Sequence, residues 1–234
     1  MSDPAPYIRP ESGTQPPYDA PAYGSTRARH PKQPLIRVPT TLTEAAAPRF
    51  TPAWYAPHAD MSQVGGKAAM GERIIVAGRV TDENGRALAN TMVEIWQANA
   101  SGRYHHARDQ HDAPLDPHFE GRARVFTDDE GRYRFTTIKP GAYPWRNHHN
   151  AWRPIHIHFG LHGAGFAQRM ITQMYFPGDP LLALDPVFQS TADAAARDRL
   201  VSVFDLDVTQ PEWALGYRFD IVLRGQAATP FEKA

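Results

Sequence analysis

Short β-branched segments separated by turn signals constrain the fold of this 234-residue chain more than any other feature. The segments RIIVAGRV (73–80) and TMVEIWQ (91–97) have the composition or the alternation of β-strands, and the turn sequence DENG (82–85) lies between them. A second pair of segments, at 124–127 and 132–138, flanks the turn sequence DDEG. These patterns predict two β-hairpins.

The rest of the chain continues this pattern. Further strands are expected at 153–159, 169–176 and 217–223, and the apolar spacing over 192–204 predicts one short helix with Thr191 as its cap. Many short strands joined by turns predict a mainly-β sandwich with large loops. Non-catalytic transthyretin-like modules have sandwiches of this kind, so the fold alone does not establish a function.

The first 55 residues differ in composition from the rest of the chain. Most of the 22 prolines crowd into the first sixty residues, and a segment of this kind cannot build a core of its own. It is nevertheless aromatic, with Tyr7, Tyr18, Tyr23, Phe50, Trp54 and Tyr55. We therefore interpret residues 1–55 as an extended N-terminal arm that packs on a partner chain, with PLIRVP (34–39) as a candidate edge strand. Residues 56–234 would form the catalytic β-sandwich domain.

Composition excludes several classes of function. Lys plus Arg and Asp plus Glu each total 25, so a neutral chain has no electrostatic reason to bind nucleic acid or an anionic membrane. The absence of cysteine excludes disulfides, thiolate metal sites and a cysteine nucleophile. The N-terminus lacks a basic start followed by an apolar core, and no apolar run reaches transmembrane length. We expect a cytoplasmic protein.

The sharpest local motif is IHIHF at 155–159. Side chains alternate along a strand, so His156 and His158 project to one face and their apolar neighbours to the other. Two imidazoles on one face can bind one metal ion. From spacing alone, the more common alternative is a pair of polar residues on a solvated face.

The surroundings of this motif favour a functional site. Pro144 and Pro154 restrict the backbone on either side of an aromatic-rich loop, and such stiffness is useful where a loop must position a side chain. Tyr143 precedes the first of these prolines, and Tyr104 lies in a polar loop after a strand. Taken singly, each tyrosine is more often a core-edge residue that forms a hydrogen bond through its hydroxyl.

Three segments, WQANASGRY, IKPGAYPWRN and WRPIHIHF, closely resemble the intradiol ring-cleaving dioxygenase family, and in particular the β-chains of its two-chain members. The resemblance runs from about Thr26 to Glu232 and includes GERIIVAGRV, ITQMYFPGDP and YRFDIVLRG. It implies a non-haem Fe(III) ion held by Tyr104, Tyr143, His156 and His158. Phenolate oxygen suits this hard ion, and two tyrosinates with one hydroxide balance its three positive charges.

The same resemblance implies the reaction and further roles. The reaction is the intradiol cleavage of protocatechuate by O2 to 3-carboxy-cis,cis-muconate, a step in the β-ketoadipate route of aromatic-compound degradation. Tyr143 would leave the metal and accept a substrate proton, Arg153 would stabilise carbanion character on the ring, and Gln173 would be a second polar active-site residue. The substrate-binding positions would be Trp145, Val187 and Tyr23, the last near the substrate's carboxylate.

The family also implies a partner. A related α-chain that lacks the iron ligands would pair with this chain, the active site would form at their interface, and the α–β units would assemble into a larger oligomer. The chain alone is then expected to be unstable or poorly active.

Three alternatives remain open from the sequence. Catechol and hydroxyquinol 1,2-dioxygenases use the same ligand set but typically carry a helical N-terminal dimerisation domain, unlike this Pro-rich segment. A non-catalytic transthyretin-like module would need no tyrosines matched to the two histidines. A zinc hydrolase would need a further His, Cys or carboxylate ligand, and none lies on the strand face with His156 and His158.

Overall fold

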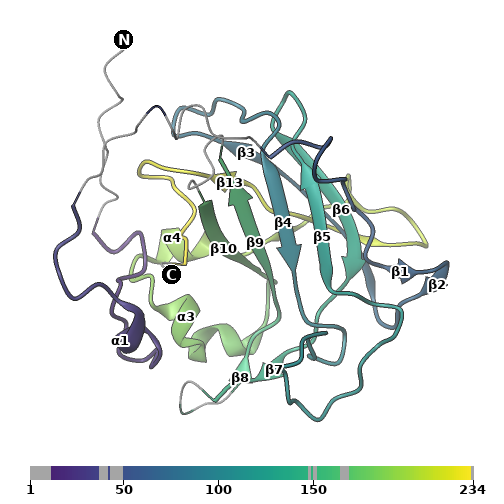
Figure 1. Ribbon diagram of the computed structural model, residues 1–234, viewed down its shortest axis with the longest axis horizontal. Coiled ribbons are helices and arrows are strands. Elements are labelled where there is room, and N and C mark those ends of the chain that lie inside the picture. The colour runs from purple at the N-terminus through teal and green to yellow at the C-terminus, as the bar shows by residue number, and fades with distance from the viewer. Residues whose placement is uncertain are drawn as a thin grey trace.

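The computed structural model describes residues 12–36, 42, 50–146, 149, 152–163 and 169–232. Two β-sheets account for most of its regular structure (Figure 1). The first sheet is antiparallel, with the strand order β10 (Arg169–Tyr175), β9 (His156–His162), β4 (Met92–Trp96) and β5 (Arg122–Phe126).

The second sheet is built around β3 (Arg73–Thr81). Strands β12 (Leu215–Arg218) and β13 (Ile221–Val222) pair in parallel with it, and β6 (Arg132–Ile138) pairs antiparallel with it. The short edge strand β11 (Val203–Phe204) pairs with β12. Two small ladders complete the strands: β1 (Gln63–Val64) with β2 (Lys67–Ala68), and β7 (Tyr143–Pro144) with β8 (Trp152–Arg153).

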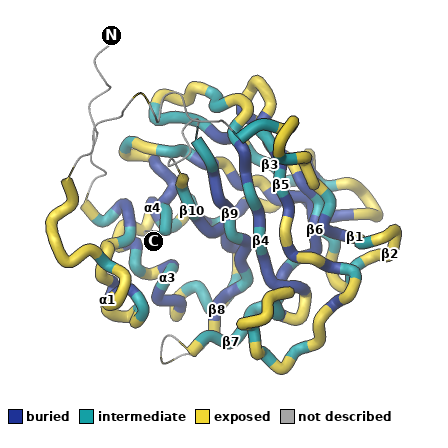
Figure 2. Tube along the Cα trace, viewed as in Figure 1, coloured by how far each residue is buried: buried dark blue, intermediate teal, exposed yellow. Residues whose placement is uncertain are grey.

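The hydrophobic core lies between the two sheets, as the predicted sandwich requires. Its buried side chains come from both sheets, and Phe159 of β9 meets Phe135 of β6 with ring centroids 5.9 Å apart. Figure 2 shows the buried residues concentrated along the strands. Removing one large apolar side chain of this kind from water contributes about 1.5 to 3 kcal/mol. The predicted mainly-β sandwich is confirmed.

The DENG hairpin is confirmed only at its turn, where Thr81 and Ala87 form an antiparallel bridge, and the longer strands that flank the two predicted turns do not pair with one another. The DENG turn forms, and the Gly85 amide donates to the Asp82 carbonyl at 3.1 Å. However, β3 and β4 on its two sides belong to different sheets, and so do β5 and β6 around the DDEG turn. Both turns therefore carry the chain from one layer to the other. Turn residues specify a local reversal but not the sheet that the next strand joins.

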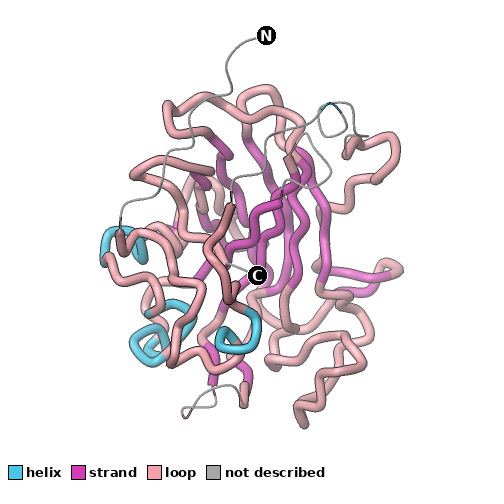
Figure 3. The backbone as a smooth tube through the Cα atoms, turned by 60° about the vertical axis from the view of Figure 1, so that its left-hand side comes forward, coloured by secondary structure: helices cyan, strands magenta, loops and turns pink. Residues whose placement is uncertain are grey.

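The helices are short. Those whose full span lies within the described residues are α1 (Thr26–Arg29), the 3-10 helix η1 (Pro180–Leu184), α3 (Pro186–Gln189) and α4 (Ala194–Asp198). The helix predicted over 192–204 is only α4, and its cap is Asp193 in place of Thr191: the Asp193 carboxylate accepts from the Ala196 amide at 2.7 Å. Figure 3 shows these helices beside the strands on one side of the molecule. None of the described helices has the length and apolar character needed to span a bilayer.

The described part of the N-terminal arm lies on its own chain. The Gln15 side chain donates to the Thr229 carbonyl at 3.2 Å and accepts from the Phe231 amide at 2.9 Å. The Gly13 carbonyl accepts from the Asp193 amide at 2.9 Å. The arm thus packs against the C-terminal segment and α4, and its contact with a partner chain stays a prediction. The candidate edge strand at 34–39 forms no strand over 34–36, and its remainder lies outside the described residues.

Candidate active site

Three neighbouring strands form the floor of a polar site. On β9, His156 and His158 lie on the face opposite the core, as the alternation predicts. The register places Gln173 and Tyr175 of β10 beside His158 and His156, respectively, and Trp96 of β4 on the other side of His158. The side chains of β10, β9 and β4 therefore converge on one face of the first sheet.

Both predicted tyrosines reach this face from loops. Tyr104 follows β4, and Tyr143 lies on β7, paired with Arg153 of β8. The ring centroids of the two tyrosines are 5.3 Å apart. The Tyr143 hydroxyl lies 3.4 Å from Nε2 of His156, and the Tyr104 and His158 ring centroids are 6.4 Å apart. The structure thus brings together all four candidate ligands, which come from three separate segments.

Asn99 and Gly102 hold the two tyrosine loops together. The Asn99 side chain accepts hydrogen bonds from the Ser101 and Arg103 amides at 3.0 Å each. The backbone carbonyl of Asn99 accepts from the Gly141 amide at 2.9 Å. Gly102 has a φ of 77°, and a Cβ there would overlap the carbonyl oxygen of Ala142. Only glycine allows the loops to approach this closely.

Replacing Gly102 with alanine should therefore destabilise the protein more than the same change at Gly85. Gly85 has a similar φ of 76° but open space around its position, so both variants carry the left-handed strain and only one adds a backbone clash. The free energy of unfolding, measured by chemical denaturation, should fall about 1 to 3 kcal/mol further in Gly102→Ala. Equal losses in the two variants would contradict the close approach of the loops.

Both histidine side chains are neutral, so each can offer a ring-nitrogen lone pair to a metal ion. Nδ1 of His156 lies 2.7 Å from the Pro154 carbonyl, which accepts a hydrogen bond from the Nδ1–H group and so leaves the Nε2 lone pair directed toward Tyr143. Burial, and then the charge of Arg153, lower the pKa of His156 well below its usual value and that of His158 to about 3. His158 also stacks on Trp96, with ring centroids 4.8 Å apart and an interplanar angle of 6°.

Two buried polar atoms at the site lack partners. The Tyr104 hydroxyl and Nδ1 of His158 have no hydrogen-bond partner among the described residues. Burial, and then the adjacent Tyr143, raise the pKa of Tyr104 well above 10, and burial raises the pKa of Tyr143 although Arg153 opposes it. An unsatisfied buried hydroxyl costs about 1 to 3 kcal/mol, and a cation beside it would remove this cost and favour the phenolate.

This donor set fits a hard, highly charged metal ion. Two phenol oxygens can become anionic ligands and two neutral imidazoles complete the set, which matches the preferences of Fe(III) better than those of a soft ion. A zinc-type donor set is not found: the part of the chain that the structure describes contains no group of three or more His, Cys, Asp or Glu residues that could hold a metal ion.

Arg153 lies in a buried ion pair. Its side chain is 4% exposed, and its Nε and Nη2 donate to the two carboxylate oxygens of Asp185 at 2.8 and 3.1 Å. Nη2 also donates to Gln173 at 2.7 Å, and the guanidinium lies over the Trp145 ring at 5.1 Å from its centroid. Arg153 is therefore not a surface salt-bridge residue. Asp185 is a site residue that sequence reasoning missed, although its position before Pro186 marks it as a helix cap.

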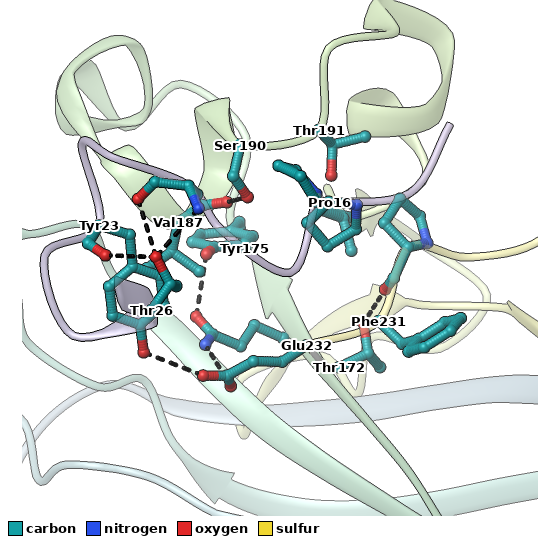
Figure 4. Close-up of a pocket in the computed structure, with 15 residues that line it drawn as sticks. Pro16, Tyr23, Thr26, Thr172, Tyr175, Val187, Ser190, Thr191, Phe231 and Glu232 are labelled. Carbon is teal, nitrogen blue, oxygen red and sulfur yellow. Dashed lines mark hydrogen bonds between the residues drawn. The ribbon is translucent and has the colours of Figure 1, made fainter. Parts of the chain in front are cut away.

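The remaining predicted residues line a neighbouring pocket. Tyr23, Gln173 and Val187 line it, between the arm, α3 and the C-terminal segment (Figure 4). Glu232, also missed from the sequence, accepts from the Tyr23 hydroxyl at 3.1 Å and from the Gln173 amide at 3.3 Å. The four candidate ligands lie outside the lining of this pocket, and Trp145, 5.1 Å from Tyr23 between ring centroids, connects the two regions.

The sandwich fold and this site define a class of protein, and comparison with known proteins identifies that class. The family model described as "Dioxygenase" matches residues 45–225, and the chain belongs to the intradiol dioxygenase family. A second model, "Protocatechuate 3,4-dioxygenase beta subunit N terminal", matches residues 7–41. The protocatechuate 3,4-dioxygenase beta chain of Burkholderia cepacia is 56% identical over 94% of each chain.

Two further comparisons concern a partner chain and the fold. The protocatechuate 3,4-dioxygenase alpha chain of Burkholderia cepacia is 31% identical and matches 78% of this chain and 82% of its own length. The crystal structure of hydroxyquinol 1,2-dioxygenase from Pseudomonas putida DLL-E4 superposes with a TM-score of 0.55, covering 87% of this chain and 71% of that one. Its identity is 21%, so this likeness supports the fold alone.

Proposed function

We propose that this chain is the iron-bearing subunit of an enzyme that cleaves protocatechuate with O2 between its two hydroxyl-bearing carbons, giving 3-carboxy-cis,cis-muconate. The observation that carries this proposal is the convergence of two buried tyrosine hydroxyls on two neutral histidines. Tyr104, Tyr143, His156 and His158 would hold a non-haem Fe(III). When bound, Fe(III) would draw electron density from the deprotonated catechol and make a ring carbon reactive toward O2.

The chain's own residues would accept a substrate proton and stabilise negative charge. A catechol must lose two protons to chelate a metal ion; the Tyr143 oxygen would accept one of them on leaving the metal, and the hydroxide that balances the charge of Fe(III) would accept the other. Nη1 of Arg153 lies 3.5 Å from that oxygen, close enough to stabilise negative charge that develops on the ring. Tyr104, His156 and His158 stay in place as ligands throughout the cycle.

The other predicted residues would orient the substrate. Trp145 offers an aromatic face between Arg153 and Tyr23, and Val187 forms an apolar wall on α3. Tyr23 would approach the substrate's carboxylate, for which it must exchange its present partner, the carboxylate of Glu232. Gln173 holds the Arg153 guanidinium and would face the substrate or O2.

The proposal includes a partner. The two Burkholderia cepacia relatives are the beta and alpha chains of protocatechuate 3,4-dioxygenase, and this chain is similar to both. We propose that it pairs with a related α-chain that lacks the iron ligands, that residues 1–55 contact this partner, and that the α–β units form a larger oligomer.

The alternative activities have less support. Catechol 1,2-dioxygenase 2 of Acinetobacter lwoffii is 34% identical, but the match covers 56% of this chain and 47% of that one. The match of residues 7–41 to a beta-subunit model favours the protocatechuate-type enzyme instead. A non-catalytic transthyretin-like module is contradicted by the family match over residues 45–225.

Co-expression with a candidate α-chain tests the proposal. The purified pair should be burgundy-red from tyrosinate-to-Fe(III) charge transfer, and anaerobic protocatechuate should change its visible absorption before O2 is admitted. This chain expressed without a partner should be less stable and poorly active. A correctly assembled pair that is colourless, contains no iron and binds no catechol would overturn the proposal, and zinc without iron would favour a hydrolase.

A further inference from the structure

The Arg153 guanidinium makes its short hydrogen bonds through Nε and Nη2, and not through Nη1. Nε donates to Asp185, and Nη2 donates to Asp185, Gln173 and Tyr175 at 3.1, 2.7 and 3.1 Å. Within the described part of the chain, Nη1 has a single hydrogen-bond partner, the Tyr143 hydroxyl at 3.5 Å. The nitrogen that faces the proposed reacting centre is therefore the one that the surrounding contacts leave available.

Asp185 supplies the most extensive of these contacts. The residue is 0% exposed. Its two oxygens accept from Nε and Nη2 of Arg153, from the Tyr175 hydroxyl at 3.2 Å and from the Phe188 amide at 3.2 Å. A two-pronged carboxylate–guanidinium pair fixes the plane of the guanidinium as well as its position. Because neither buried charge forms another ion pair among the described residues, moving one of them would leave the other unpaired.

We propose that Asp185 is the positioning residue that sets the direction of Arg153 Nη1 toward the reacting centre. This inference rests on the proposed function, in which Arg153 stabilises charge on the substrate ring. Asp185 acts through Arg153 and touches no candidate ligand. It also caps α3, which carries Val187, so one carboxylate fixes both the guanidinium and a wall of the substrate pocket.

The experiment compares Asp185→Asn with Asp193→Asn in the iron-loaded pair of chains. Asparagine keeps the size and the capping ability of aspartate but removes the charge and one acceptor. Asp193 is a matched control, because it caps α4 in the same way and makes no contact with Arg153. Asp185→Asn should lower kcat about 10- to 100-fold, as expected for a misplaced catalytic group. Iron content, visible absorption and anaerobic protocatechuate affinity should stay close to those of the parent enzyme.

A double variant separates positioning from a general structural role. If Asp185 acts through Arg153, then Asp185→Asn should cause no further loss of kcat in an Arg153→Met background. Additive losses, or equal kcat values for Asp185→Asn and Asp193→Asn, would overturn the inference. Failure of the proposed function looks different, because the parent pair would then lack iron and activity.

If Asp185→Asn does not fold, Tyr175→Phe provides the test. It removes a hydroxyl that contacts Arg153, Gln173 and Asp185 while it keeps the ring. A several-fold loss of kcat with iron retained supports the inference, and an unchanged kcat overturns it.

Discussion

Replacing Arg153 with methionine should remove most of the turnover and also lower the free energy of unfolding by about 3 to 5 kcal/mol. The turnover falls because the donor beside the Tyr143 oxygen is lost. The stability falls because Asp185 is 0% exposed and would keep a buried charge without its partner. Iron content should change far less than kcat, because Arg153 is not one of the proposed ligands.

The double variant Arg153→Met/Asp185→Asn divides these two effects. Neutralising Asp185 removes the unpaired charge, so much of the lost stability should return, whereas kcat should stay low because no guanidinium is restored. Chemical denaturation of the co-expressed pair gives the first quantity, and steady-state kinetics with protocatechuate gives the second. A double variant as unstable as Arg153→Met, or one that regains turnover, would contradict the assignment.

The local part of the site follows directly from the sequence. Alternation along β9 places His156 and His158 on one face, because side-chain direction in a strand depends only on the parity of the position. Spacing alone did not distinguish these residues from solvated histidines. Their burial, which lowers the pKa of both, is a tertiary property with no local signature.

Long-range partners account for the parts that the sequence did not predict. Asp185 pairs with Arg153 across 32 residues, and Glu232 bonds to Tyr23 across 209 residues. The assignment of Tyr104 and Tyr143 needed the family resemblance, because a lone tyrosine in a loop carries no metal signal. The strand pairing expected around the two turns was wrong for a related reason: β3 and β4 are adjacent in sequence, but each finds its pairing partners elsewhere in the chain.

Tyr104→Phe should abolish iron binding and leave the metal-free protein at least as stable as the parent. The Tyr104 hydroxyl is buried and has no hydrogen-bond partner among the described residues, so its removal eliminates an unsatisfied group. Tyr104 is also the anionic protein ligand that would stay on Fe(III) throughout the cycle, whereas Tyr143 would leave it, so this change deletes the permanent anionic ligand. A gain in metal-free stability together with a loss of metal is expected of a side chain that is selected for binding and not for folding.

Tyr143→Phe is the matched comparison. Its hydroxyl has two long contacts, 3.4 Å to His156 Nε2 and 3.5 Å to Arg153 Nη1, so its loss should change stability little. With three protein ligands remaining, this variant should retain iron and its colour, but it should bind protocatechuate slowly because the base that accepts a catechol proton is missing.

Iron per α–β pair, visible absorption and anaerobic stopped-flow binding distinguish the two variants. Tyr104→Phe should be colourless, and Tyr143→Phe should be coloured with an observed binding rate at least about tenfold below that of the parent, the lower end of the range for general-base loss. Full iron occupancy in Tyr104→Phe would remove that residue from the ligand set. Parent-like binding kinetics in Tyr143→Phe would show that the catechol proton goes elsewhere, and only the role of Tyr143 as the departing ligand would then have to be abandoned.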